Sequence, residues 1–293
     1  MLLLLSLEQL ATLDLYLWLE REEEAARRLN LHQTSVSRQL RRALKALDLK
    51  LDRSAPHRAV VGELELLAAE RQVHQLARLK GRQPLRLDAF FSFGPWFAPG
   101  LPPGWLSGNF DLPGKARPLA LLEERVIDAW IGSYQPDMPD PDDPLFFSLD
   151  LLHFPVYVTA APDHPLAGVR QISAGDLSRF PSLALPSGWF PKTEAKLKSQ
   201  GLWSDPVRIQ RYDPDSWEGR SADGVTMLYG TSFSDTLQPG NVRLDWDMDH
   251  RSGDTLVLRR DLLDQPAMAA LIEALQRRAR DLSALFEDVA LAA

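Results

Sequence analysis

The 293-residue chain contains no cysteine. This absence excludes disulfide bonds, thiolate metal ligands and cysteine nucleophiles, and it suits a reducing compartment. The six histidines lack the spacing of a metal site, and the chain has neither a glycine-rich phosphate loop nor a Gly-x-Ser-x-Gly nucleophile motif. We therefore expect no metal and no cofactor, and no catalytic residue can be named.

Long hydrophobic runs are also absent. No stretch approaches the roughly 20 apolar residues that a membrane-spanning helix needs. The apolar run at residues 1–5 is too short for a signal peptide and lacks the basic residues and the cleavage site of one. We therefore expect a cytoplasmic protein without a membrane partner. The length predicts two or three domains, and the hydrophobic content of 45% is ordinary for a globular protein.

The chain is negatively charged overall, but positive charge is concentrated near its start. The formal net charge is −7, yet residues 25–58 contain nine lysines and arginines and only two acidic residues. Such asymmetry is typical of a nucleic-acid-binding segment. A solvated, charged helix face has the same composition, so charge alone leaves both interpretations open.

Three helices are predicted in the first fifty residues. A capping box of Ser6 and Gln9 starts the first helix, the second spans residues 22–29, and the third runs from about residue 33 to residue 47. Apolar residues recur every three or four positions along one face of the third helix, whereas polar and basic residues follow another face. That polar face meets either a DNA groove or only water.

The polar face of the third predicted helix carries side chains of the kinds that read DNA. Short hydrogen-bonding groups lie in its first turn, which enters the major groove in helix-turn-helix proteins. Glutamine and arginine pair with adenine and guanine, and the later basic residues suit phosphates. The candidate DNA-binding residues are Gln33, Thr34, Ser35, Ser37, Arg38, Arg41, Arg42 and Lys45.

This segment resembles the DNA-binding domain of LysR-type transcriptional regulators. The similarity lies in residues 25–29, which match the family's Ala-Ala pair and following leucine, and in residues 33–40. Residues 33–40 match the family's recognition helix, Ser-Gln-x-x-Val-Ser-x-Gln-Ile/Leu, from its first glutamine to its final leucine. The resemblance implies an all-α winged helix-turn-helix domain over residues 1–60. It also implies double-stranded promoter or operator DNA as a partner.

The residues on either side of the recognition helix depart from the family pattern. His32 replaces a serine, residues 21–24 replace a Gly-Ser turn, Asp48 replaces a glycine, and Asp52 replaces a phenylalanine where the wing begins. The loss of that apolar anchor predicts a frayed or reshaped wing. Two carboxylates near DNA predict weaker binding than in the family, or none.

Residues 62–80 are predicted to form a long helix. Its apolar residues follow the 3-4-3 spacing of a coiled-coil-like seam, which consists of Leu66, Ala69, Val73 and Leu76. The spacing leaves open whether this seam packs on the chain's own core or on a second chain. The resemblance implies a linker helix, here residues 61–82, that pairs two chains into a homodimer or a higher homo-oligomer.

The remainder, residues 83–293, alternates short apolar strands with helical stretches, which indicates α/β architecture. Strands are predicted at residues 85–91, 128–132, 154–160, 182–185, 225–229 and 255–259, and helices at residues 117–126, 193–199 and 265–289 with a capped turn at residues 173–177.

Several of these segments resemble the effector-binding region of the same family, in the same order along the chain. They are residues 126–132, 161–167 and 172–177. The resemblance implies a two-lobed, periplasmic-binding-protein-like domain, with the first lobe at about 83–160 plus 255–293 and the second at about 161–254. The family binds a small molecule between the lobes, and the matching positions here are Ser92, Phe93, Ser133, Ser187 and Thr231.

The family's first long helix of the effector domain has no counterpart here. Residues 94–104 contain four prolines and three glycines, so they cannot form one continuous helix. We expect Trp96, Phe97 and Trp105 to fill the space. The result is either a small, aromatic-lined pocket or a filled cleft with no ligand.

These observations favour a LysR-type transcriptional regulator that is controlled by a small-molecule effector. The first alternative is a diverged relative that keeps the fold and the dimer but has lost DNA reading or ligand sensing. The second alternative, an enzyme on this fold, would require convergent titratable groups with perturbed pKa values in the cleft.

Overall fold

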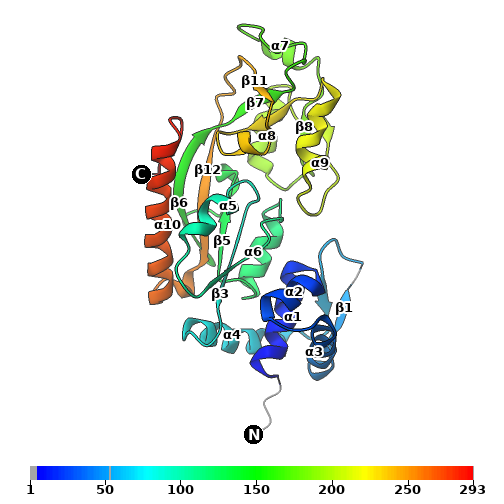
Figure 1. The fold of residues 1–293 in the computed structure, drawn as a ribbon, viewed down its shortest axis with the longest axis vertical. Helices are drawn as coiled ribbons and strands as arrows, with labels where there is room; N and C mark the ends of the chain where they lie inside the picture. Colours follow the sequence, from blue (N-terminus) through cyan, green and yellow to red (C-terminus); the bar gives the residue numbers. More distant parts are fainter. Residues whose placement is uncertain (1–4, 53, 293) are drawn as a thin grey trace.

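The computed structural model describes residues 5–52 and 54–292, so most of the apolar start and Arg53 lie outside the described residues. Figure 1 shows a helical N-terminal unit at one end, a large sheet in the middle and smaller sheets at the other end. The helices are α1 Leu7–Leu19, α2 Glu22–Leu29, α3 Gln33–Ala46, α4 Glu65–Leu79, α5 Gly94–Phe97, α6 Ala116–Glu123, α7 Ala174–Leu177, α8 Pro191–Ser199, α9 Pro214–Trp217 and α10 Pro266–Leu285. The strands are β1 Lys50–Asp52, β2 Ala59–Val61, β3 Leu85–Ala89, β4 Trp105–Ser107, β5 Ala129–Gly132, β6 Phe146–Pro155, β7 Tyr157–Ala160, β8 Leu183–Ala184, β9 Asp205–Pro206, β10 Leu228–Gly230, β11 Val242–Arg243, β12 Arg251–Arg259 and β13 Ala290–Leu291.

The N-terminal unit consists of α1, α2, α3 and the antiparallel hairpin of β1 and β2. The capping box is present, since the Ser6 hydroxyl accepts from the Gln9 amide at 3.2 Å and the Gln9 side chain accepts from the Ser6 amide at 2.9 Å. His32 takes over the cap of α3, where its Nδ1 accepts from the Thr34 amide at 3.4 Å. Asp48 adopts the left-handed backbone, with φ of 51°, which aspartate tolerates better than most residues.

The hairpin is paired in spite of Asp52. Lys50 pairs with Val61 and Asp52 with Ala59, and the Asp52 carboxylate accepts from the amide and the hydroxyl of Ser54 at 2.8 and 2.6 Å. A local turn of this kind uses the carboxylate where the family pattern has an apolar anchor. The strands on either side of the segment predicted to be frayed or reshaped are therefore paired.

The N-terminal unit shares part of its hydrophobic core with the large sheet. Trp18, Ala25 and Val36 belong to the same cluster of buried side chains as Leu87 of β3 and Ile131 of β5. The Trp18 indole donates to the buried Asp88 carboxylate at 2.5 Å.

Gly108 leaves room for this contact between the unit and the sheet. A Cβ atom at Gly108 would lie 2.6 Å from an Asp88 oxygen, closer than side-chain carbons approach in real structures. A side chain at position 108 would therefore disturb the Asp88 carboxylate that accepts from Trp18.

The large sheet has the order β13-β6-β12-β5-β3-β4. Strands β4, β3 and β5 run parallel, whereas β12, β6 and β13 add antiparallel pairs. Helix α10 runs along the β6 side of the sheet (Figure 1). Loops that follow the parallel strands β3 and β5 meet at the edge that faces the smaller sheets, where ligands bind in open α/β sheets.

The second lobe contains a three-stranded sheet of order β10-β7-β11 and a two-stranded sheet of β8 and β9. The predicted strand at residues 154–160 is divided at Val156, so that β6 belongs to the large sheet and β7 to the second lobe. The chain passes from the large sheet to the three-stranded sheet at this break. It returns where β12 begins at Arg251.

The segment at residues 94–104 forms no continuous helix, as its prolines and glycines predict. It contains the four-residue α5 and a 3-10 turn, Ala98–Gly100. Phe97 is fully buried, and the Trp96 ring packs edge-on against Phe233 and Phe286. Trp105 lies in β4, beside Leu85 of β3.

Helix α4 is shorter than predicted and is buried on its polar face. Arg71 donates to Asp14 of α1 at 2.9 Å and to Glu124 at 2.8 Å. Arg78 makes two hydrogen bonds to the Asp128 carboxylate, at 2.8 and 2.9 Å. Helix α4 therefore ties α1 to the large sheet through charge-assisted hydrogen bonds to the buried Asp14 and Asp128.

The apolar seam of α4 faces outward instead. Its members Leu66, Val73 and Leu76 are 47%, 60% and 51% exposed, and Ala69 is exposed as well. The seam therefore does not pack on the chain's own core, which was one of the two possibilities that the spacing left open.

Candidate nucleic-acid interface and ligand cavity

The outer face of α3 presents most of the predicted DNA-binding side chains together. Exposed positions on this face are Gln33, Thr34, Arg38, Arg41, Arg42 and Lys45. The opposite face is held by the buried Val36, Leu40 and Ala43. Because one face is buried and the other is exposed, the helix projects a row of polar and basic groups away from the molecule.

Two of the predicted DNA-binding residues are less accessible to DNA. Ser35 and Ser37 are half-buried, and the Ser37 hydroxyl donates to Glu22 of α2. Arg28, which also adds to the basic character of the segment, points away from α3 toward the carbonyl oxygens of Ser107 and Gly108. The positive surface of this unit is thus concentrated on the middle and the end of α3.

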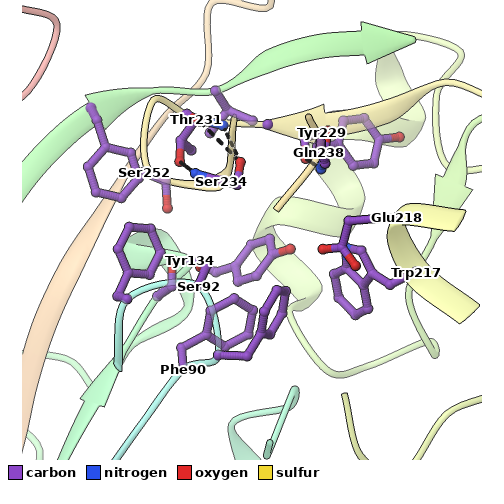
Figure 2. A pocket seen from close by; sticks show the side chains of 16 residues that line it. Phe90, Ser92, Tyr134, Trp217, Glu218, Tyr229, Thr231, Ser234, Gln238 and Ser252 are labelled. Carbon is purple, nitrogen blue, oxygen red and sulfur yellow. Dashed lines mark hydrogen bonds between the residues drawn. The ribbon is translucent and has the colours of Figure 1, made fainter. Parts of the chain in front are cut away.

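A cavity of about 60 Å³ lies between the two lobes. Its walls come from the loops after β3 and β5, from β6, β10 and β12, and from the segment around α9 (Figure 2). The residues that line it are Phe90, Phe91, Ser92, Phe93, Ser133, Tyr134, Phe154, Val156, Trp217, Glu218, Tyr229, Gly230, Thr231, Ser234, Gln238 and Ser252.

Aromatic rings form the wall on the side of the large sheet. Tyr134 stacks on Phe190 with ring centres 4.0 Å apart and meets Phe90 edge-on at 5.5 Å. Phe91 meets Trp217 edge-on at 5.1 Å. Tyr134 also has a left-handed backbone, with φ of 60°, which is costly for a large side chain and is tolerated mainly at functional sites.

Glu218 is the acidic residue of the cavity. It is 9% exposed, and one of its oxygens accepts from the Tyr212 hydroxyl at 2.8 Å. Burial raises the pKa of Glu218 to about 7, although the Tyr212 hydrogen bond opposes that shift. Figure 2 shows the Glu218 carboxylate and the Tyr134 hydroxyl pointing toward one another.

Hydroxyl groups line the remaining wall, and they differ in how far they are satisfied. Thr231 and Ser234 bond to each other, since the Ser234 hydroxyl accepts from the Thr231 amide at 2.7 Å (Figure 2). Gln238 accepts from the Thr159 hydroxyl at 2.9 Å. The hydroxyl of Ser252 is buried and has no hydrogen-bond partner among the described residues, so it is available to a polar group inside the cavity.

The structure brings four of the five predicted effector-binding residues to this cavity. Ser92, Phe93, Ser133 and Thr231 line it, whereas Ser187 lies outside and donates to Glu194 at 3.0 Å. The prediction did not name Tyr134, Trp217, Glu218, Tyr229 or Ser252. Tyr134 directly follows the predicted Ser133, so its place in the sequence was a signal. Trp217, Glu218, Tyr229 and Ser252 reach the cavity only through contacts between residues distant along the chain.

A two-residue segment connects the cavity to the N-terminal unit. Arg211 donates to Glu20 and to the Trp18 carbonyl, each at 3.0 Å, and it pairs with Asp111. The next residue, Tyr212, stacks on Phe91 with ring centres 3.7 Å apart, while its hydroxyl reaches Glu218. Adjacent residues thus hold the end of α1 and the wall of the cavity.

Neither a metal cluster nor a membrane span is found in the described part of the chain. Across residues 5–52 and 54–292, no group of three histidine, aspartate or glutamate side chains is arranged to hold a metal ion. Nor does any helix in those ranges combine the length and hydrophobicity that a bilayer crossing requires.

Comparisons with known proteins identify one family. The family model described as LysR substrate binding domain matches residues 112–280. No curated protein sequence matches the chain.

Solved structures match along nearly the whole chain. A full-length cysteine-to-aspartate variant of OxyR from Pseudomonas aeruginosa is 17% identical, with a TM-score of 0.55, and the match covers 94% of this chain and 95% of that one. The H2O2-bound cysteine-to-serine mutant of OxyR from Corynebacterium glutamicum is 18% identical, with a TM-score of 0.51 and 96% of each chain covered. Full-length CbnR, solved in complex with its target DNA, is 15% identical, with a TM-score of 0.54, and the match covers 94% of this chain and 100% of that one. At these identities the likeness concerns the fold.

Proposed function

The chain belongs to the LysR family of transcriptional regulators, and we propose that it binds double-stranded DNA through α3 under the control of a small molecule held between its lobes. The observation that carries this proposal is the exposed face of α3, where Arg38, Arg41 and Arg42 project from a helix whose opposite face is buried. Such a face supplies both base-reading and phosphate-binding groups.

The proposal assigns a role to each part of the chain. Residues 1–60 are a winged helix-turn-helix, with α3 as its recognition helix and the β1–β2 hairpin as its wing. Residues 61–82 form the linker, and residues 83–293 form the effector-binding domain. Within the latter, the cavity beside Ser92, Ser133 and Thr231 is the effector site.

Homodimerisation through α4 is part of the same proposal. The buried face of α4 is polar and its exposed face is apolar, the reverse of a helix that borders water. An exposed stripe of this kind is covered when the same helix of a second chain packs against it. The pair would present two recognition helices to two half-sites.

Control of DNA binding by the cavity is supported by Arg211 and Tyr212. A molecule that moves Glu218 or Phe91 also displaces Tyr212, which touches both residues. A displacement of Tyr212 also moves the adjacent Arg211, which bonds to the end of α1. The effector thereby changes how the DNA-binding unit is seated on the effector domain.

Two features favour a working regulator over a diverged relative without DNA or ligand binding. Arg38 is exposed rather than buried. Trp96 and Phe97 pack behind the cavity and do not line it, so the space between the lobes stays open. A regulator also suits the cavity better than an enzyme, since Glu218 is the only carboxyl among its lining residues and already accepts a hydrogen bond from the Tyr212 hydroxyl.

DNA binding is tested with promoter-length DNA from upstream of the protein's own gene, at about 50 and about 200 mM salt. We expect affinity to fall steeply with salt, by about 0.9 logarithmic units of affinity per logarithmic unit of salt for each phosphate contact. Arg170→Ala is the control for substitutions of the arginines on α3, because Arg170 is an exposed arginine of the second lobe. This variant should bind DNA like the unaltered protein. Equal binding at both concentrations, or none at the lower one, contradicts the proposal.

A further inference from the structure

The charge of the cavity sets the class of ligand that it accepts. Its 16 lining residues include Glu218 but no lysine, arginine or histidine. A carboxylate ligand would enter without a positive partner and would meet Glu218 as a like charge. Burying an anion in such a place is costly, whereas a cation gains a partner there.

The aromatic lining reinforces this preference. Seven of the 16 lining residues are phenylalanine, tyrosine or tryptophan. The face of an aromatic ring carries negative charge density, so rings attract ammonium groups from which water has been excluded. In Figure 2 the Trp217 ring lies next to the Glu218 carboxylate, and the Tyr134 hydroxyl approaches from the other side.

The size of the cavity limits the ligand further. The cavity of about 60 Å³ is small beside the roughly 300–1,000 Å³ of pockets for drug-sized ligands, so it favours a compact ligand. The unpartnered Ser252 hydroxyl adds one hydrogen-bonding group to the wall, since no described residue bonds to it. A compact ligand with a charged head and at most one polar substituent fits these limits.

We propose that the cavity binds a small organic cation, either a protonated amine or a quaternary ammonium, with its charge beside Glu218 and its carbon groups against the aromatic rings. This inference rests on the proposed function of the cavity as the effector site. It concerns only the ligand's chemical class, and it holds or fails independently of what α3 binds.

The titration of Glu218 makes the binding dependent on pH. The groups that face Glu218 are Tyr212, which donates to it, Asp213, which acts on it through its charge, and Tyr134 across the cavity. The pKa of Glu218 is about 7. Below that pH the carboxyl is neutral and attracts a cation less, so affinity for the cation falls as the pH falls.

Calorimetric titration of the full-length protein tests the proposal with three probes. Tetramethylammonium is the cation, tert-butanol is its neutral counterpart of similar shape, and acetate is the anion. At about pH 8 we expect tetramethylammonium to bind about tenfold or more tightly than tert-butanol, and acetate not to bind. Between about pH 8 and about pH 5.5 we expect its affinity to fall about tenfold or more.

Glu218→Gln locates the site, because glutamine keeps the acceptor for the Tyr212 hydroxyl and removes the charge. This variant should lose the preference for tetramethylammonium over tert-butanol and its dependence on pH. Glu194→Gln is the matched control, since Glu194 is a buried glutamate of the same lobe outside the cavity. It should retain both properties. If Glu218→Gln fails to fold, the pH profile of the unaltered protein decides.

The outcomes separate this inference from the proposed function. Stronger binding of acetate or tert-butanol than of tetramethylammonium overturns the cation class and leaves an effector site. Equal affinity for tetramethylammonium at both pH values also overturns the role of Glu218. If no probe binds while DNA binding proceeds as proposed, the cation inference fails and the regulator remains.

Discussion

Asp254 lies within β12 with both carboxylate oxygens buried and without a hydrogen-bond partner among the described residues. Burial raises the pKa of this carboxyl well above its usual value. The folded protein therefore keeps Asp254 neutral under conditions in which the unfolded chain has released the proton. The free energy of unfolding should therefore depend on pH through Asp254.

Asp254→Asn should remove a dependence of stability on pH. Because the folded pKa is raised, the stabilising effect of the proton is complete below about pH 4 and is lost as the pH rises, at up to about 1.4 kcal/mol per pH unit. Asparagine is neutral throughout, so the variant should be more stable than the unaltered protein at alkaline pH. Urea denaturation at mildly acidic and mildly alkaline pH measures this difference, with Asp281→Asn on the exposed side of α10 as the control. The same pH dependence of stability in the unaltered protein, Asp254→Asn and Asp281→Asn would contradict this role of Asp254.

Arg38 and Arg42 should contribute to DNA binding in different ways. Arg38 is nearer to the first turn of α3, so Arg38→Ala should cost about 1–3 kcal/mol on the preferred sequence and relax sequence preference. Arg42→Ala should weaken binding to all DNA alike and reduce the salt slope by about one. Competition binding with specific and random DNA distinguishes the two. Equal losses of sequence preference would refute the separate roles.

At the scale of single elements, α4 exposes an apolar face to water. Its seam of Leu66, Ala69, Val73 and Leu76 is exposed while arginine, histidine and glutamine side chains are buried beneath it. The spacing in the sequence predicts the seam but not the direction in which it faces. That direction depends on Asp14 and Asp128, which lie on other elements and draw the polar side inward.

Charge placed on this seam should separate the dimer. Two glutamates, at Val73→Glu and Leu76→Glu, would face their counterparts across the two-fold axis and repel them. We expect the dimer dissociation constant to rise by about 100-fold or more, since each buried leucine-sized side chain contributes about 1.5–3 kcal/mol. Sedimentation equilibrium measures this change. Val169→Glu, a change at an exposed valine off α4, should leave the assembly intact; a monomeric unaltered protein would end the dimer proposal.

Elements with local signals were predictable from the sequence. The capping box of Ser173 and Asp176 marks α7, and the prolines and glycines of residues 94–104 mark the broken helix. Strand β6 carries no such signal over most of its length and was predicted only at its end, although at ten residues it is the longest of the described strands. Its stability comes from pairing with β12, about a hundred positions later.

Residues of the cavity, like the elements, were predictable only where a local signal in the sequence marks them. Ser92 and Ser133 follow the predicted strands directly, so their approach could be inferred from the order of the elements. Trp217 and Glu218 arrive from the second lobe, after the chain has crossed and begun to return. No local pattern marks them, because their role is set by what lies opposite in the folded molecule.

On the scale of the whole molecule, Arg211 joins the second lobe to the N-terminal unit. It holds Glu20 and the Trp18 carbonyl, and Asp111 completes its surroundings. Burial alone would raise the pKa of Glu20, but hydrogen bonds from His57 and Arg211 lower it to about 2. The end of α1 is therefore held by side chains from two distant parts of the chain.

Arg211→Met should loosen the N-terminal unit. Without the guanidinium the end of α1 loses its contacts with the second lobe, so amide hydrogen exchange around residues 16–22 should accelerate about tenfold, the equivalent of about 1.4 kcal/mol. Exchange in α10 should not change. Arg170→Met is the control, and Tyr212→Phe should preserve protection at α1 while removing the bond to Glu218. Unaltered exchange in Arg211→Met would mean that the Arg211 contacts do not stabilise the end of α1.

The shared core of the N-terminal unit and the large sheet has a consequence for how the protein comes apart. Trp18 and Val36 pack in the same cluster as Leu87 and Ile131, while Leu10, Leu13 and Leu40 belong to a second cluster within the N-terminal unit. One part of the unit's interior is therefore complete only when the unit is seated on the sheet. Heat should therefore melt the two in a single cooperative transition. A chain cut after residue 82 would expose the surface that Trp18 covers, and such a fragment would be prone to aggregate rather than behave as an autonomous sensor.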